Sequence, residues 1–232
     1  MLKKESNQTN CNLCKSSDVV VLYVSEVKGV SRTYLHCNYC DLVFVPSIFH
    51  LTSLEQKKRY LEHNNDINDP DYRKFLFRLW KYMKPILPNG ANGLDYGAGP
   101  GPALVQMIIE DGYNIAPYDP IFYPNQDLLE KSYHFITSTE TFEHFSNPGI
   151  EIKKLKELLK PNGILGIMTS MLTSWIDFPD WYYHRDPTHI AFYSKRTMEW
   201  IAGQFLWDIE FPRENVVLFK SGDLLTILCL YN

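Results

Sequence analysis

The apolar and polar positions of the chain follow three different patterns. Residues 19–27 and 31–37 are rich in β-branched and aromatic residues on either side of Gly29, which predicts an antiparallel hairpin. Residues 46–88 carry apolar side chains at helical spacing, and from residue 89 short apolar runs alternate with helical patterns. This last alternation is typical of a parallel sheet with crossover helices, so the sequence predicts an α/β fold.

The middle stretch predicts two helices. Thr52 and Glu55 have the spacing of a capping box ahead of a short polar helix. A second helix opens at residues 69–71, Asp-Pro-Asp, and ends before Pro85. Its apolar positions share one face and are Tyr72, Phe75, Leu76, Leu79, Trp80 and Met83. We interpret residues 46–88 as a helical connector packed on the main domain, with a lid over a ligand pocket as the alternative.

Composition places the chain among ordinary soluble proteins. Its 232 residues suffice for one full domain with a small appendage, and 23 Lys and Arg against 27 Asp and Glu give a net charge of −4. Because the chain has no Lys/Arg run, nucleic acid is not the expected partner. No apolar stretch is long enough to span a bilayer, and the start of the chain lacks the apolar core of a signal peptide, so we expect a cytoplasmic protein.

Four of the five cysteines form two CxxC pairs. Cys11 and Cys14 precede the predicted hairpin, and Cys37 and Cys40 follow it, with 22 residues between the pairs. Each CxxC turn can aim two thiolates at one ion, so this spacing favours a tetrahedral zinc site over four unrelated thiols. We therefore expect residues 1–45 to form a zinc ribbon whose zinc is structural, because protein would fill all four positions on the ion.

A glycine-rich loop follows the first strand of the third stretch. Gly97, Gly99 and Gly101 alternate in the segment Asp-Tyr-Gly-Ala-Gly-Pro-Gly, and such glycines let a backbone turn tightly and approach a ligand. Asp95 stands two residues before the first of them. Asp119 follows the next predicted strand, where a carboxylate can accept hydrogen bonds from both hydroxyls of a ribose. These residues predict a nucleotide-like ligand at the carboxyl ends of the strands.

These motifs resemble those of the class I S-adenosylmethionine-dependent methyltransferases. LDYGAGPG is similar to their first motif, and TSTETFEHF followed by LLKPNGILGIMT is similar to their fourth and following motifs. The resemblance covers the domain of residues 89–232 and implies a Rossmann-like, doubly wound sheet of seven strands that ends in an antiparallel hairpin of residues 215–220 and 224–231. It also implies the cofactor-binding residues Asp95, Gly97, Ala98, Gly99, Gly101, Asp119, Thr139 and Glu140.

One part of that family pattern is missing from the sequence. The family has a third strand that ends in an acid contacting the adenine, but only residues 121–132 separate Asp119 from the next predicted strand. Asp127 is the one acid well placed in this segment, and we carry no adenine-binding role over to it.

A cluster of acids and histidines follows the glycine loop. Two segments contribute oxygen and nitrogen donors: Glu140, Glu143 and His144 in ETFEH, and His184, Asp186 and His189 in HRDPTH. Carboxylates with imidazoles suit a divalent metal that orients a substrate hydroxyl and lowers its pKa. The ExxEH element with a later histidine resembles O-methyltransferases of ubiquinone biosynthesis and small-RNA 2′-O-methyltransferases. That resemblance implies four candidate ligands of a second metal, namely Glu140, Glu143, His144 and His189.

Two other interpretations of this cluster stay open. The EH pair is widespread in class I methyltransferases that use no metal, so His144 or His189, beside Glu143, can instead be a metal-free catalytic base. His184 and Asp186 can orient a catalytic histidine. Four aromatic residues nearby favour packing, with the wall of an acceptor pocket as the alternative: Trp175, Trp181, Tyr182 and Tyr183.

The sequence therefore predicts a methyltransferase that uses S-adenosylmethionine, a structural zinc and a candidate second metal. O-methylation of a small-molecule or carrier-borne substrate is the favoured reaction. The alternative within enzymes is carbon or nitrogen methylation of a sugar-pathway or secondary metabolite. An alternative of another class is a non-catalytic module in which the ribbon binds RNA or a protein, and the intact glycine loop, Asp119 and ETFEH argue against it.

Overall fold

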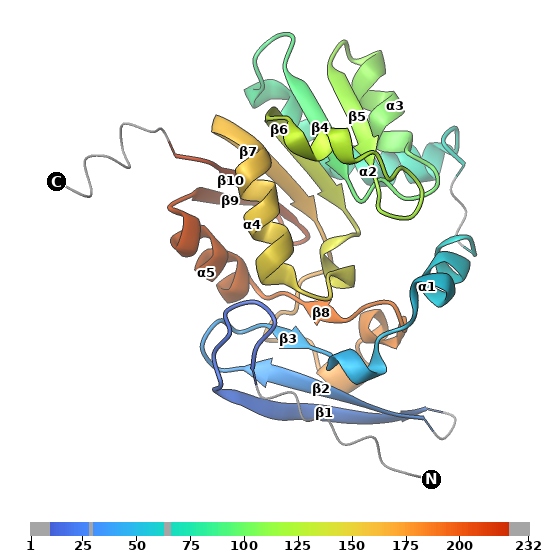
Figure 1. Cartoon of the computed structure of the whole chain (residues 1–232), viewed down its shortest axis with the longest axis vertical. Helices are drawn as coiled ribbons and strands as arrows, with labels where there is room; N and C mark the ends of the chain where they lie inside the picture. Colours follow the sequence, from blue (N-terminus) through green and yellow to red (C-terminus); the bar gives the residue numbers. More distant parts are fainter. Residues whose placement is uncertain (1–9, 28–29, 63–65, 223–232) are drawn as a thin grey trace, which may run out of the picture.

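Two β-sheets organise the part of the chain that the computed structural model describes, residues 10–27, 30–62 and 66–222. The larger sheet has the strand order β5-β4-β6-β7-β10-β9, and the smaller sheet has the order β1-β2-β3-β8. Figure 1 shows the larger sheet in the upper part of the molecule and the smaller one below it. The strands are β1 Val19–Val27, β2 Val30–Cys37, β3 Val43–Phe44, β4 Asn92–Tyr96, β5 Asn114–Tyr118, β6 Tyr133–Thr139, β7 Leu159–Met168, β8 Ala191–Phe192, β9 Asp208–Arg213 and β10 Val216–Lys220.

The larger sheet has helices on both faces. Its strands β5, β4, β6 and β7 are parallel, and β10 is antiparallel to both of its neighbours. The α-helices are α1 Ser53–Tyr60, α2 Pro70–Met83, α3 Ala103–Glu110, α4 Pro148–Leu158 and α5 Lys195–Phe205. Short 3₁₀ turns lie at Ser47–Phe49, Lys84–Ile86, Gln126–Glu130, Phe142–His144, Phe178–Asp180 and Tyr182–Arg185. The predicted α/β fold with crossover helices is therefore confirmed.

Alternation along the parallel strands separates two apolar cores. Phe135 and Ile164 pack with α2 and α3 on one face, whereas the adjacent Ile136 and Leu165 pack with α4 and α5 on the other. Successive side chains of a strand point to opposite faces, so both faces of these strands are buried. The continuous apolar runs of the sequence follow from this double burial.

The end of the larger sheet differs from the expected hairpin. The structure pairs β10 with β9, across a turn at residues 214–215, so the strand before residues 215–220 is its partner. The run 224–231 lies outside the described residues. The 3₁₀ turn Gln126–Glu130 takes the place of the missing third strand, and within the described residues the sheet has six strands rather than seven.

The smaller sheet joins the amino-terminal hairpin to the main domain. β1 and β2 form the predicted antiparallel hairpin, and β3 continues it. The fourth strand, β8, comes from the segment that follows the larger sheet's β7, and Val43 and Phe44 of β3 pair with it. The cysteine-bearing segment therefore shares backbone hydrogen bonds with a segment roughly 150 residues further along the chain.

The connector contains the two predicted helices. Thr52 and Glu55 form the capping box of α1, with the Glu55 carboxylate accepting from the Thr52 N–H at 2.8 Å. Asp69 caps α2, whose buried residues are Leu76, Leu79, Trp80 and Met83. No helix in the described ranges is long and apolar enough to cross a membrane.

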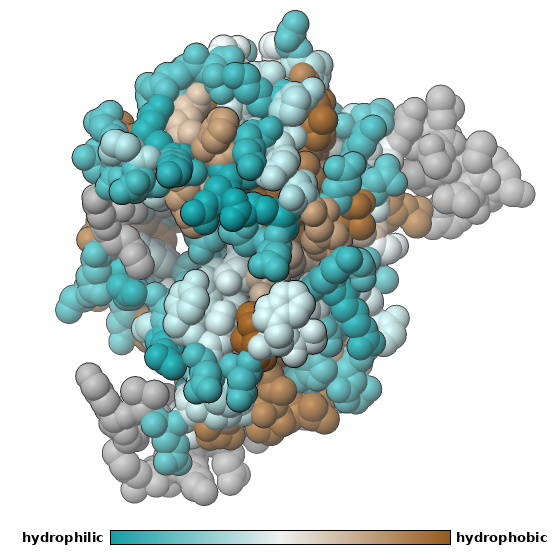
Figure 2. Space-filling view, turned by 180° about the vertical axis from the view of Figure 1, so that it is seen from behind, coloured by the Kyte–Doolittle hydropathy of each residue, from teal (hydrophilic) through white to brown (hydrophobic). Residues whose placement is uncertain are grey.

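The edge strand β1 exposes part of its apolar pattern. Val20, Val21, Leu22 and Val24 are each at least 44% exposed. Figure 2 shows brown side chains gathered at the lower end of the molecule, where β1 lies in Figure 1. The β-branched run that predicts this strand thus reflects strand propensity more than burial.

Candidate active site

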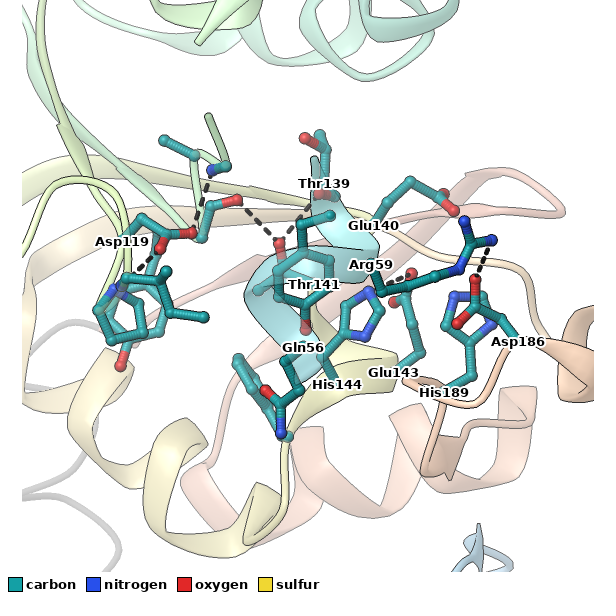
Figure 3. Close-up of a pocket in the computed structure, with 18 of the residues that line it drawn as sticks. Gln56, Arg59, Asp119, Thr139, Glu140, Thr141, Glu143, His144, Asp186 and His189 are labelled. Carbon is teal, nitrogen blue, oxygen red and sulfur yellow. Dashed lines mark hydrogen bonds and ion pairs between the residues drawn. The ribbon is translucent and has the colours of Figure 1, made fainter. Parts of the chain in front are cut away.

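A cavity of about 940 Å³ opens at the carboxyl ends of β4, β5 and β6. The glycine loop and the residues after β5 and β6 form one side, and residues of α1, α2 and the segment 182–189 form the other. In Figure 3, Asp119 lies at one end of this site and His189 and Asp186 lie at the other. Parallel α/β sheets bind ligands at this edge, so the sequence motifs converge where the fold predicts a site.

The glycine loop forms a floor of the cavity. Gly97 has φ +85°, and a side chain on it would collide with Thr141. Gly99 has φ +63°, and the space that a Cβ would occupy there is empty. Ala98 also lines the cavity, whereas Gly101 lies outside it against a smaller hollow beside α3. The first two glycines therefore permit a turn and an approach that other residues would block.

Asp119 orders the loop after β5. Its Oδ2 accepts a hydrogen bond from the Gly99 N–H at 3.1 Å. Its Oδ1 accepts from the N–H groups of Ile121 at 2.8 Å and Phe122 at 3.0 Å. The carboxylate lines the cavity together with Thr139, so both predicted residues face the candidate ligand space.

Asp95 lies beneath the glycine loop and not along the cavity wall. It is 3% exposed, and Thr137 Oγ1 donates a hydrogen bond to its Oδ1 at 2.7 Å. Burial raises the pKa of this carboxyl to about 7, although the Thr137 hydrogen bond lowers it. Asp95 lies below the loop and outside the lining of the cavity, so its contact with the cofactor stays a prediction.

Three of the four predicted ligands of a second metal converge. Single ligand atoms of Glu143, His144 and His189 all lie within 4.8 Å of one another. Glu143 is fully buried and its Oε2 accepts from Thr169 Oγ1 at 2.9 Å. Its Oε1 is buried without a hydrogen-bond partner in the described part of the chain and lies 4.0 Å from His144 Nε2. A buried, unpartnered oxygen beside two imidazoles suits a bound cation or a hydrogen-bond donor.

Both imidazoles present the same nitrogen to this centre. His144 Nδ1 donates to the carbonyl of Thr188 at 3.0 Å, and His189 Nδ1 donates to the carbonyl of Tyr183 at 2.7 Å. Because a carbonyl only accepts, each neutral ring carries its proton on Nδ1 and its lone pair on Nε2. Burial also lowers the pKa of His189, which favours its neutral form. Metal-binding histidines are held in this way.

Glu140 is set apart from the converging group. It has φ +48°, a strained backbone for a residue with a side chain, and it lines the cavity. Burial and the neighbouring Glu143 raise its pKa to about 9, while the Tyr183 hydroxyl donates to it at 3.4 Å. The structure therefore brings together three of the four predicted ligands and leaves Glu140 beside them.

The other residues of HRDPTH differ in where they face. His184 lies outside the cavity, with its ring nitrogens near the Tyr34 hydroxyl and the carbonyl of Pro179. Asp186 lines the cavity and accepts from Thr188 N–H at 2.9 Å. Figure 3 shows the ion pair between Asp186 and Arg59, whose atoms are 2.8 Å apart.

Helices α1 and α2 contribute side chains to the cavity, of which Tyr72 belongs to the predicted apolar face of α2, whereas Arg59 and Tyr60 were not predicted. Arg59 and Tyr60 line the cavity from α1, and the Tyr60 ring meets the His144 ring edge-on at 5.2 Å between centroids. Tyr72 lines it from α2, and burial raises the pKa of that phenol to about 12. The capping box predicted the helix α1, but its polar pattern did not indicate which face meets the site.

Tyr183 connects several parts of the site. Its hydroxyl lies 3.2 Å from Thr169 Oγ1 and donates to Glu140, and its ring packs 4.2 Å from that of His189. Of the four aromatic residues singled out in this segment, Tyr182 also lines the cavity, whereas Trp181 is buried in a separate core and Trp175 is exposed. The aromatic segment therefore serves both packing and the cavity wall.

The four cysteines lie together in a second centre, away from the cavity. Sγ atoms are 3.6 Å apart for Cys11 and Cys40 and 3.5 Å apart for Cys14 and Cys37. A tetrahedral zinc with Zn–S bonds of about 2.3 Å requires Sγ separations of about 3.8 Å. In each CxxC turn, the residue after the second cysteine donates a backbone hydrogen bond to the carbonyl of the first. Lys15 N–H donates to Cys11 and Asp41 N–H donates to Cys37. This donor set and geometry suit zinc.

Comparisons with known proteins bear on the larger domain. A family model described as "Methyltransferase domain" matches residues 67–209. A solved structure from Galdieria sulphuraria assigned as a sarcosine dimethylglycine methyltransferase is 15% identical, with 73% of this chain and 99% of that chain covered and a TM-score of 0.47. An O-methyltransferase family protein from Burkholderia thailandensis is 14% identical, with 72% and 63% covered and a TM-score of 0.44.

Human N-acetylserotonin methyltransferase in complex with SAM is a more distant neighbour. It is 9% identical, with 56% of this chain and 47% of that chain covered and a TM-score of 0.42. A search of curated proteins found no match. At these identities and TM-scores, none of the likenesses bears on substrate or on residue roles.

Proposed function

The chain belongs to the methyltransferase-domain family whose model matches residues 67–209, and from that premise we propose that it moves a methyl group from S-adenosylmethionine to an oxygen of a small-molecule or carrier-borne acceptor. Family membership makes the chain an enzyme and disfavours a non-catalytic binding module. The observation that carries the choice of oxygen is the unpartnered Glu143 Oε1, which faces the two imidazoles of His144 and His189.

The donor site of this proposal is the glycine loop. Bound S-adenosylmethionine supplies an electrophilic methyl group. Gly99 leaves open space toward which a ligand can approach, and Asp119 stands at the end of the adjacent strand. A carboxylate offers about four lone-pair sites. Three of those on Asp119 accept backbone N–H groups, so Oδ2 keeps one for a ribose hydroxyl.

The acceptor site lies beside it, at the Glu143 end of the cavity. Glu143, His144 and His189 would hold a divalent metal, which supplies Lewis-acid polarisation of an acceptor hydroxyl. Thr169 fixes the other oxygen of Glu143, and the two carbonyl acceptors fix the imidazoles. A volume of about 940 Å³ accommodates cofactor and acceptor side by side.

Alignment and exclusion of water are the contributions of the surrounding residues. Tyr60 and Arg59 close the cavity from α1, and the Arg59–Asp186 ion pair ties that helix to the segment that bears His189. Holding the nucleophile in line with the methyl carbon turns an encounter into a unimolecular step, so a closed cavity favours transfer. Helix α1 thus acts as the lid, whereas α2 packs on the larger sheet.

Carbon or nitrogen methylation without a metal is the second candidate. The same geometry leaves the Nε2 atoms of His144 and His189 with lone pairs facing the cavity, as a general base requires. Dependence of the reaction on a divalent metal separates the two candidates.

A structural zinc completes the proposal. The convergence of Cys11, Cys14, Cys37 and Cys40 and the spacing of their Sγ atoms support it. Because four thiolates fill the coordination sphere, this zinc leaves no position for a substrate.

Calorimetric titration of S-adenosylmethionine tests the donor site. We expect binding to the zinc-loaded wild type, and Asp119→Asn to weaken it by about tenfold or more, because it removes a charged hydrogen-bond acceptor. Glu130→Gln is the matched control, because Glu130 is an exposed acid of the segment between β5 and β6. Failure of the folded wild type to bind S-adenosylmethionine would refute the proposed donor site.

Titration with Mn²⁺ tests the metal. We expect one Mn²⁺ to bind beyond the zinc, with Glu143→Gln weakening the affinity by at least about tenfold. Glu140→Gln is the matched control, because Glu140 is a half-buried carboxylate of the same wall that stands outside the converging group. No Mn²⁺ binding to the wild type, or binding that Glu143→Gln leaves unchanged, would favour the metal-free base.

A further inference from the structure

The segment that bears His189 has little regular structure of its own. Residues 186–190 follow the 3₁₀ turn Tyr182–Arg185 and precede the two-residue strand β8. A backbone segment outside helices and sheets must have its carbonyl groups satisfied by other parts of the molecule. The conformation of the segment around His189 therefore depends on the groups that donate hydrogen bonds to these carbonyls.

Arg32, on β2 of the amino-terminal sheet, donates hydrogen bonds to most of these carbonyls. Its Nη1 donates to the carbonyls of His184 at 3.5 Å and Asp186 at 3.2 Å. Its Nη2 donates to the carbonyls of Pro187 at 3.3 Å and His189 at 2.5 Å. One guanidinium thus gathers four carbonyls from six consecutive residues, which only a planar, multiply donating group can do.

Other residues of the same sheet complete the support. The Tyr34 hydroxyl donates to the carbonyl of His184 at 3.0 Å, and Val45 N–H donates to that of Ile190 at 2.9 Å. The remaining carbonyl of this stretch that faces inward, that of Thr188, accepts from His144 Nδ1. The segment is therefore held on one side by the cysteine-bearing sheet and on the other by the candidate site.

We propose that Arg32 is a positioning residue of the active site, which holds the 184–189 segment in the conformation that aims His189 at Glu143 and His144. The inference rests on the proposed function, because it takes His189 to act in that site. It makes the four-cysteine unit a part of the catalytic architecture and not an attached recognition module.

Arg32 is half-buried, and the surroundings of its guanidinium agree with this role. Desolvation lowers the pKa of its guanidinium, and its Nε is buried without a hydrogen-bond partner among the described residues. Burying a cation is costly unless its donors are used. Here the other donors meet carbonyl oxygens and Asp186 lies near enough to favour the charged form. A lysine would supply the charge without the planar fork.

The test compares Arg32→Gln and Arg32→Lys with Arg213→Gln in the full-length, zinc-loaded protein. Arg213 is an exposed arginine on β9 and serves as the matched control. Four quantities are measured: zinc content, S-adenosylmethionine affinity, Mn²⁺ affinity and deuterium uptake of the backbone in peptides spanning residues 182–190.

We expect Arg32→Gln to keep its zinc and its S-adenosylmethionine affinity but to weaken Mn²⁺ binding by about 10–100-fold, as loss of an orienting partner does. Deuterium uptake should rise in residues 182–190 and stay unchanged in β4 and β6. Arg32→Lys should fall between wild type and Arg32→Gln, and Arg213→Gln should match wild type.

Two results would overturn the inference. Unchanged uptake in residues 182–190 would show that Arg32 does not hold the segment, and a parallel loss of zinc and S-adenosylmethionine binding would show a folding role only. If the wild type binds no Mn²⁺, the metal site of the proposed function is refuted. Deuterium uptake in residues 182–190 then still tests whether Arg32 holds the segment. Raised uptake with intact S-adenosylmethionine binding then supports it, and equal uptake refutes it.

Discussion

Glu143 owes its chemical character to its surroundings. Its Oε2 is fixed by Thr169 and its Oε1 points without a partner toward two imidazoles, whereas Glu140, three residues earlier, meets the Tyr183 hydroxyl and has its pKa raised to about 9. Both carboxylates are withdrawn from water at one wall of the cavity. Two glutamates three residues apart therefore have different roles. Glu143 is a candidate metal ligand, whereas Glu140 is a protonated, neutral hydrogen-bonding group at neutral pH.

The buried carboxyl of Asp95 should make the free energy of unfolding depend on pH. Burial raises its folded-state pKa to about 7, above the value near 3.8 expected in the unfolded chain. Between these values the folded state binds more protons, so the free energy of unfolding falls as pH rises, and the loss is complete above pH 7. From pH 6 to pH 8 we expect wild type to lose about 1–2 kcal/mol more than Asp95→Asn.

Urea unfolding at the two pH values measures this difference. The range stops at pH 6 because acid competes with metal for thiolates. The amide side chain of the Asp95→Asn variant can still accept the Thr137 hydrogen bond but cannot ionise, so identical pH profiles for the two proteins would contradict a buried, titrating Asp95.

At the scale of elements, the start of α4 meets the first cysteine turn. Gly149 lies in the first turn of α4, and a Cβ placed on it would stand 2.5 Å from the carbonyl oxygen of Leu13. The Asn12 side chain also donates to the carbonyl of Ser146 at 3.1 Å. The cysteine turn and the helix that follows the catalytic segment therefore pack backbone to backbone.

Gly149→Ala should destabilise the protein by about 1–3 kcal/mol, because neither backbone can move without disturbing the cysteine centre or α4. We also expect it to retain zinc less tightly. Gly203→Ala is the control, since Gly203 is exposed in α5 with open space around its Cβ position and the change should stabilise by about 0.5–1 kcal/mol. Urea unfolding and zinc release to a chromogenic chelator measure both effects, and equal stability of the two variants would refute the tight contact.

At the scale of the whole molecule, the cysteine centre and the larger domain share one core. Cys11, Cys37 and Cys40 belong to the apolar cluster that includes residues of α4, α5 and the larger sheet. The smaller sheet also closes with β8, and Arg32 reaches from it to the candidate site. Unfolding of the two parts should therefore be coupled.

If the four cysteines bind zinc as proposed, removing it should abolish S-adenosylmethionine binding and shift the single unfolding transition to a lower urea concentration, because such a metal contributes folding energy. The measurement is calorimetry and urea unfolding after chelation, with zinc added back to restore both. Glu143→Gln separates the two metals, since it should lose Mn²⁺ affinity while keeping this transition. Two independent transitions, or cofactor binding that survives chelation, would show a separable ribbon.

Local signals predicted much of the fold. The capping box of Thr52 and Glu55, the hairpin after Cys14 and the glycine loop after β4 each depend on residues within a few positions of one another. The expected hairpin of 215–220 with 224–231 was wrong in its partner, because β9 precedes β10 and its apolar alternation is weak. Within the described residues the larger sheet has six strands, because the segment between β5 and β6 forms a 3₁₀ turn where a further parallel strand was expected.

By itself the sequence determined which chemistry the chain carries: four thiols at zinc spacing, a glycine loop after a strand and an acid–histidine cluster, because spacing along a backbone fixes the reach of nearby side chains. Only the tertiary structure decided that Glu143 and not Glu140 joins the histidines, and that Arg32 supports the segment of His189. Those choices depend on contacts between residues far apart in the chain, which for Arg32 lie more than 150 positions away, and burial and the pairing of polar groups set the outcome.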